Sequence, residues 1–122
     1  MRRGSYCISK NEYQISMAFQ DLNDTAGREL LPGFSGKFVH TDSMTVAHWE
    51  IKAGSILPLH DHVHEQVVNM LEGELEMTIG GETRVMTAGQ TYAIPSQVPH
   101  SGKALTDCKV IDVFTPARED YR

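Results

Sequence analysis

The residues best suited to chemistry are histidines clustered in the middle of the chain. His60 and His62 are two positions apart, His64 follows, and His100 ends the segment Pro95–His100. In an extended segment, residues two positions apart point to the same side, so His60 and His62 could bind one ion together. Neutral imidazole is the commonest protein ligand for first-row divalent metals. Because the chain has only six histidines, this cluster predicts a metal site.

The elements that position these histidines must include a bend. Same-face positions along a strand lie roughly 6.6 Å apart, so a ligand four residues beyond His62 could not reach the same ion from a straight strand. We therefore expect the chain to bend within residues 63–65, which would bring Gln66 to the ion. His40 and His48 lie outside the cluster and are expected to be core or surface residues.

The spacing around His60 and His62 resembles the first sequence motif of the cupin family. That motif is glycine, five residues, His-x-His, three or four residues, Glu, six residues and glycine. Gly54 and Gly73 match its two glycines. Gln66 stands where the motif has Glu, as in the variant His-x-His-x-His-Glu-Gln found in many small cupins.

A second cupin motif is matched by Gly89, Pro95 and His100. Gln97 and Ala104 replace its glycine and asparagine, which alters the turn but keeps the histidine. The resemblance implies an all-β fold, the cupin double-stranded β-helix (jelly-roll) barrel. It also implies one divalent transition metal ion (Ni, Zn, Fe, Co or Mn) held by His60, His62, Gln66 and His100.

The sequence from Gly36 onward is independently typical of an all-β domain. Short β-rich runs alternate with turn residues about every ten residues, as in a sandwich or barrel. Residues 74–79 alternate polar and apolar side chains, and Gly80–Gly81 predicts a tight hairpin turn. The expected strands are 37–40, 44–51, 66–71, 74–79, 83–86, 91–94 and 109–114.

The chain is long enough for one domain of ordinary size. Residues 1–32 are predicted to be an N-terminal arm with a short strand around residues 13–19, and residues 33–122 to form the barrel. Cys7 and Cys108 show neither CxxC spacing nor a disulfide framework, and Cys108 is expected in the core.

The C-terminal segment carries a second group of reactive residues. Asp112 and Phe114 are two apart in an apolar run and therefore face the same way, and a buried acid is costly unless it is paired or used. The segment resembles the tail of the small cupins known as pectin-degradation proteins, Asp-x-Phe-(Ser/Thr)-Pro-x-Arg-x-Asp-(Phe/Tyr). The resemblance implies functional roles for Asp112, Phe114 and Arg118.

In that family the reaction is the linearisation of 4,5-unsaturated monouronates left by polyuronate lyases. The anomeric hydroxyl loses a proton, the ring C–O bond breaks, and an enolate forms beside the C6 carboxylate. A metal would act as a Lewis acid, and Asp112 would move protons from the hydroxyl or onto C4. Arg118 would bind the carboxylate, and Phe114 would contact the sugar ring.

Two other functions remain open at this point. One is a metal-dependent dioxygenase, although a neutral Gln ligand does not favour the higher iron charge states. The other is a non-catalytic cupin that binds a sugar or another small molecule. No helix-turn-helix pattern accompanies the barrel.

The overall charge indicates which classes of binding partner to expect. The net charge is −5 and no Lys/Arg-rich segment occurs, so nucleic acid and an anionic membrane surface are not expected as partners. No signal-peptide pattern or 18-residue apolar run occurs, so a cytoplasmic location is expected. Small cupins commonly pair, and a homodimer with an anionic small-molecule substrate is expected.

Overall fold

The computed structural model describes residues 6–8 and 19–122. In that part of the chain the regular structure is β-strand, apart from the short 3₁₀ helices η1 (Leu22–Asp24) and η2 (Glu119–Tyr121). The strands are β1 (Tyr6–Ile8), β2 (Arg28–Leu31), β3 (Phe34–Thr41), β4 (Thr45–Ile51), β5 (Ile56–His60), β6 (Glu65–Glu72), β7 (Leu75–Ile79), β8 (Glu82–Met86), β9 (Thr91–Ile94), β10 (His100–Ala104) and β11 (Cys108–Thr115).

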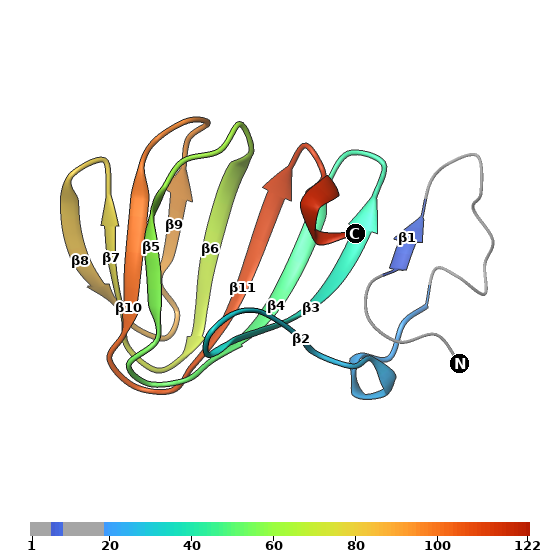
Figure 1. Ribbon diagram of the computed structural model, residues 1–122, viewed down its shortest axis with the longest axis horizontal. Helices are drawn as coiled ribbons and strands as arrows, with labels where there is room; N and C mark the ends of the chain where they lie inside the picture. The colour runs from blue at the N-terminus through green and yellow to red at the C-terminus, as the bar shows by residue number, and fades with distance from the viewer. Residues whose placement is uncertain (1–5, 9–18) are drawn as a thin grey trace.

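The strands form two sheets with the order of a jelly roll. Within the described residues, the larger sheet has the order β1-β3-β4-β11-β6-β9, with β2 paired to β3, and the smaller sheet has the order β5-β10-β7-β8. The chain crosses repeatedly between the sheets after β4, and β11 enters the larger sheet between β4 and β6 (Figure 1). The all-β cupin fold expected from the sequence is therefore confirmed.

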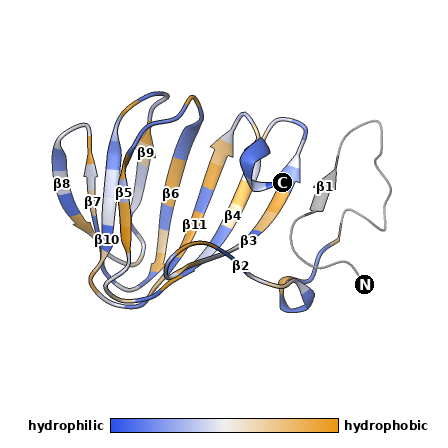
Figure 2. Ribbon diagram, viewed as in Figure 1, coloured by the Kyte–Doolittle hydropathy of each residue, from blue (hydrophilic) through white to orange (hydrophobic). Residues whose placement is uncertain are grey.

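The alternation of polar and apolar residues determines which face of each strand is buried. In β7, Leu75 and Met77 are buried, whereas Glu76 and Thr78, which follow them in turn, are half-buried. Figure 2 shows the same mixture of hydrophobic and hydrophilic residues along β6 and β11. The largest buried side chains come from both sheets and meet between them; they include Phe38, Met70, Met86, Ile94 and Phe114.

All seven strands expected from the sequence are present, with small differences at their ends. The Gly80–Gly81 turn joins β7 to β8, and both glycines have positive φ values, 55° and 86°. Strands β5 and β10 were not among the expected ones. β5 contains a proline and has mostly exposed side chains, and β10 contains a glycine and a lysine, so neither has the alternation that identifies a strand.

The sheet begins before the predicted domain boundary at residue 33. β2 pairs antiparallel with β3, and its Leu30 and Leu31 pack against the core. β1 pairs in parallel with the outer edge of β3. The short strand expected around residues 13–19 lies outside the described residues, except for Phe19, which is exposed and not in a strand. In the described ranges, no helix has the length and apolar character needed to cross a membrane.

Candidate metal centre and its cavity

The predicted metal ligands converge where the two sheets approach each other. His60 ends β5, His62 lies in the loop after it, and His100 begins β10. The candidate ligand atoms of these three histidines all lie within 4.8 Å of one another. Gln66, the second residue of β6, places its Oε1 atom 3.2 Å from His62 Nε2. The four residues predicted to be ligands therefore form one cluster.

The bend expected between His62 and Gln66 is present. β5 ends at His60 and β6 begins at Glu65, so the intervening loop carries the chain from the smaller sheet to the larger one. Gln66 is buried and points inward, whereas the Glu65 side chain is exposed. Glu65 is therefore a neighbour of the cluster rather than a member of it.

Backbone carbonyl groups fix the orientation of all three rings. His60 Nδ1 lies 2.7 Å from the Pro58 carbonyl oxygen, His62 Nδ1 lies 3.0 Å from that of His64, and His100 Nδ1 lies 2.9 Å from that of Val98. A carbonyl oxygen can only accept a hydrogen bond, so each Nδ1 must carry the proton. In the neutral rings the lone pair is then on Nε2. Histidines that bind a metal through one ring nitrogen usually donate a hydrogen bond from the other nitrogen to a carbonyl or carboxylate oxygen, as these three rings do.

Several polar atoms in the cluster fit a cation. His100 Nε2 is buried and has no hydrogen-bond partner among the described residues. Because His62 Nε2 is unprotonated, it and Gln66 Oε1 are both acceptors, and a cation between them would satisfy both. Three imidazole nitrogens and one amide oxygen suit a first-row divalent ion such as Ni, Zn, Fe, Co or Mn.

The electrostatics also favour neutral, metal-binding histidines. The pKa of His100 is lowered to about 4, mainly by burial; the hydrogen bond to Val98 opposes the shift, and the nearby His60, His62 and Arg118 add to it. Burial likewise lowers the pKa of His62. Both rings are therefore neutral at pH 7 and can donate their Nε2 lone pairs.

The loops that carry the two motifs are joined directly. Gln97 stands where the second cupin motif has glycine and adopts a φ of 66°, a conformation that glycine enters more easily. Its backbone N–H donates to the His62 carbonyl oxygen at 2.8 Å. The turn therefore keeps the glycine-like backbone despite the substitution, and it links the His62 loop to the segment that precedes His100.

Asp112 lies beside the cluster with one oxygen fixed and the other available. It is buried on the inner face of β11, and Trp49 Nε1 donates to its Oδ2 at 3.1 Å. Oδ1 is buried with no hydrogen-bond partner in the described part of the chain. Burial raises the pKa of Asp112 to about 7, although Gln66, Trp49 and Arg118 all favour its charged form. This carboxyl group can therefore both accept and release a proton near neutral pH.

Phe114 faces the same side as Asp112, as the sequence predicts, and is also buried. Its ring centre lies 5.9 Å from that of His62 and 6.4 Å from that of His64. His64 is therefore close to the site, although it does not belong to the metal-binding group.

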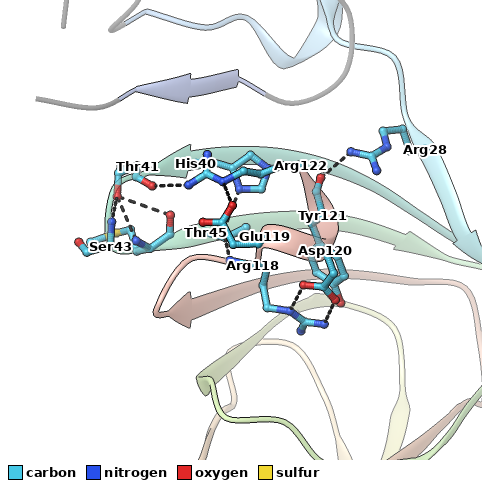
Figure 3. A network of polar contacts seen from close by, with 11 residues as sticks. Arg28, His40, Thr41, Ser43, Thr45, Arg118, Glu119, Asp120, Tyr121 and Arg122 are labelled. Carbon is cyan, nitrogen blue, oxygen red and sulfur yellow. Dashed lines mark hydrogen bonds and ion pairs between the residues drawn. The ribbon is translucent and has the colours of Figure 1, made fainter. Parts of the chain in front are cut away.

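Arg118 is buried but already has an anionic partner. Its Nε donates to Asp120 Oδ1 at 2.9 Å and its Nη2 to Asp120 Oδ2 at 2.6 Å (Figure 3). The guanidinium carbon lies 4.7 Å from the Phe114 ring centre and 4.0 Å from that of Tyr121. Asp120 thus occupies one edge of the guanidinium group, and Nη1 lies outside this ion pair.

The segment that carries Arg118 is attached to β2, β3 and β4. Arg118 N–H donates to Thr45 Oγ1 at 2.8 Å, and Arg28 Nη1 donates to the Tyr121 carbonyl oxygen at 2.6 Å. Arg122 Nη2 donates to the Thr41 carbonyl oxygen at 3.0 Å (Figure 3). These bonds position Arg118 and Tyr121 against the inner face of the larger sheet.

All the predicted site residues line one cavity of about 370 Å³. The sequence reasoning missed other residues that line it, among them Trp49, Tyr121, Leu30 and Leu31. Trp49 could have been recognised from the alternation of β4. Tyr121 follows directly on the Arg118 segment, but Leu30 and Leu31 precede the recognisable motifs and gave no signal.

The site geometry agrees with a match to a known family. The family model described as cupin domain matches residues 47–114, which include the histidine cluster, Asp112 and Phe114. This chain belongs to the cupin family.

Cys108, expected in the barrel core, is buried with a free thiol.

Among its relatives, this cupin is similar to proteins of different kinds. It is 28% identical to the pectin degradation protein KdgF of Dickeya dadantii (strain 3937) over 102 residues, 81% of this chain and 93% of that protein. Its fold matches the structure of KdgF from Halomonas sp. with a TM-score of 0.79 and 28% identity, over 84% of this chain and 96% of that chain.

A third similarity is to a regulator. The chain is 39% identical to the HTH-type transcriptional regulator PuuR of Escherichia coli (strain K12) over 57 residues, 45% of this chain. The match covers 31% of that regulator, so this chain spans about a third of its length.

Proposed function

We propose that this cupin is a metal-dependent enzyme that linearises 4,5-unsaturated monouronates. The observation that carries the proposal is the position of the Asp112 carboxyl group, with its unpartnered Oδ1, in the same cavity as the four-residue candidate metal site. The similarity to two pectin-degradation proteins along most of their length supports the choice of substrate.

The metal would be held by His60, His62, Gln66 and His100. When bound, a divalent ion supplies Lewis acidity beside substrate oxygen atoms. Because Gln66 is neutral, the four protein ligands carry no charge, so anionic oxygen ligands of a substrate are favoured.

Asp112 would transfer the proton that the reaction has to move. Its Oδ1 accepts the proton of the anomeric hydroxyl as the ring C–O bond breaks, and the electron pair of that bond stays on the former ring oxygen. Asp112 Oδ1 then delivers this proton to C4, which converts the C4–C5 enolate to the 5-keto sugar. Trp49 fixes Oδ2, so the carboxyl group presents Oδ1 in one orientation.

Arg118 and Phe114 would bind and orient the sugar acid. The positive charge of Arg118 attracts the C6 carboxylate, and Asp120 and Tyr121 hold the guanidinium group in place. Because Asp120 occupies Nε and Nη2, the substrate carboxylate would meet the edge that includes Nη1. Phe114 offers an apolar face to the ring.

The test follows the ultraviolet absorbance of a 4,5-unsaturated galacturonate incubated with the metal-loaded protein. We expect a metal-dependent loss of the conjugated double bond that is abolished in His60→Ala. The matched control is His48→Ala, because His48 lies on the outer face of β4, and it should react at the wild-type rate.

An unchanged absorbance with metal bound would contradict the proposed reaction. A non-catalytic binding role would then be the better account, and calorimetry with the same uronate would measure it. Turnover that is equal in His60→Ala and in the wild type would instead contradict the role of the metal.

A further inference from the structure

The cavity is polar at one end and apolar over the rest of its wall. Its ionisable and metal-binding side chains gather around the histidine cluster. The rest of the wall is largely hydrophobic, including Leu31, Phe34, Val68, Leu75, Met77 and Val110. The proposed reaction on a sugar acid uses the polar end and leaves this apolar part unexplained.

The strand register places the apolar part directly beyond the histidine cluster. On β6 the inward-facing residue after Gln66 is Val68, and on β10 the one after His100 is Gly102, which pairs with Met77 of β7. On β11, Val110 is the inward-facing residue beyond Asp112. The inward-facing residues beyond the histidine cluster therefore offer a ligand hydrophobic contacts. Asp112 lies between these apolar residues and the polar end of the cavity.

Strand β2 closes part of this apolar compartment from the side of the N-terminal segment. Leu30 and Leu31 line the cavity and pack against the core. An apolar cavity of about 150 Å³ is enough to bind benzene. A volume of about 370 Å³ can therefore hold a chelating head group together with an apolar group of that size.

We infer that the site binds a second class of ligand, 2-oxo or 2-hydroxy carboxylates that carry an apolar tail of three to six carbon atoms. The two adjacent oxygen atoms of the head group match the His60, His62, Gln66 and His100 cluster with its ion, and the carboxylate matches the charge of Arg118. The tail enters the compartment lined by Leu31, Val68 and Met77. The inference shares the candidate metal site with the proposed function but does not use its substrate.

The test measures the affinity of a homologous series by calorimetry on the Ni²⁺-loaded protein: pyruvate, 2-oxobutanoate, 2-oxopentanoate and 2-oxohexanoate. Each buried methylene should lower Kd about fourfold, so 2-oxohexanoate, with three more methylenes, should bind about 60-fold more tightly than pyruvate. The heat-capacity change on binding should become more negative with tail length because apolar surface is buried. A Kd that does not change along the series would overturn the inference.

Two variants separate binding in this compartment from binding elsewhere. Leu31→Trp fills the compartment from β2 and should abolish the dependence of Kd on tail length. Val85→Trp, on the partly exposed β8 position, is the matched control and should behave as the wild type. If folded Leu31→Trp keeps the full dependence on tail length, the tail binds elsewhere and the inference is wrong.

If Leu31→Trp fails to fold, the affinities of the wild-type protein for the 2-oxo acid series still test the inference. Val68→Ala provides a second variant. By enlarging the compartment, Val68→Ala should extend the tail-length dependence to longer chains. The same preparations are assayed with the unsaturated uronate. Turnover without tail dependence contradicts only this inference, and tail dependence without turnover contradicts only the proposed function.

Discussion

The two sheets contribute different chemistry to the same cavity. The smaller sheet and the loop beside it supply His60, His62 and His100, whose rings are oriented by backbone carbonyl groups. The larger sheet supplies Gln66 and Asp112, and its Trp49 fixes the carboxyl group through a side-chain hydrogen bond. The three candidate histidine ligands and the proposed proton carrier thus have separate supports, and mutations should separate their roles.

The largest expected effect is on the smaller sheet. His100→Ala removes a candidate ligand, so metal affinity should fall by more than the roughly 10–100-fold that loss of an outer hydrogen-bond partner costs. Metal analysis after dialysis should give a stoichiometry well below that of the wild type, and uronate turnover should be lost with the metal. His48→Ala is the control. Full metal content in His100→Ala would remove this residue from the ligand set.

The matching change in the larger sheet should leave the metal in place. Asp112→Asn removes the proton carrier but is nearly the same size, so kcat should fall by about 100-fold to 10,000-fold with unchanged metal content. Single-turnover kinetics on the metal-loaded protein measures the effect. If the variant keeps the wild-type rate, another group transfers the proton.

The same substitution should increase stability at neutral pH. Burial raises the pKa of Asp112 from its ordinary value to about 7, so ionisation in the folded state is unfavourable. The protonated Asp112 carboxyl group makes its full contribution to the free energy of unfolding below pH 3.8, and this contribution is lost as the pH rises towards 7. The gain of Asp112→Asn in unfolding free energy should therefore increase with pH and reach at most about 4 kcal/mol at pH 8.

Urea unfolding of the metal-free proteins at pH 5 and pH 8 measures this difference. His100 provides an opposing trend, because its pKa is lowered to about 4 by burial and its contribution is lost as the pH falls from 6.5 to 4. Comparison of Asp112→Asn with the wild type at each pH cancels the His100 contribution. An equal gain at both pH values would mean that Asp112 does not titrate in this window.

The smallest expected effect concerns Arg118. Arg118→Lys keeps the charge but loses the planar pairing with Asp120, so KM for the uronate should rise about tenfold while kcat changes little. Steady-state kinetics measures the two parameters separately. Unchanged kinetics would mean that Arg118 has only a structural role.

The sequence predicted the β-rich strands because their side chains alternate, and it predicted the ligand cluster because histidines are rare and closely spaced. It did not predict β5 and β10, although these strands carry His60 and His100. Apart from Leu57, their other side chains are exposed, small or polar, so tertiary pairing rather than local pattern defines these strands. The candidate metal site therefore left a clearer signal in the sequence than the strands that support it.

The pairing of Arg118 with Asp120 was also beyond sequence reasoning. Closely spaced opposite charges usually lie in solvent, and only the packing of Phe114 and Tyr121 shows that this guanidinium is buried. Several expectations from the sequence stay predictions. They are the four ligand assignments, the roles of Asp112, Phe114 and Arg118, the division of the chain at residue 33, the homodimer and the cytoplasmic location.

The central position of β11 has a consequence for how the protein folds during synthesis. β11 follows β1 to β10 in the chain, yet it pairs with β4 on one side and β6 on the other. Until β11 has left the ribosome, β3–β4 and β6–β9 have no strand between them, and their pairing edges are open to incorrect partners. The strand that completes the sheet is also the one that carries Asp112, so the barrel closes and the proposed proton-transfer group enters the cavity in the same step.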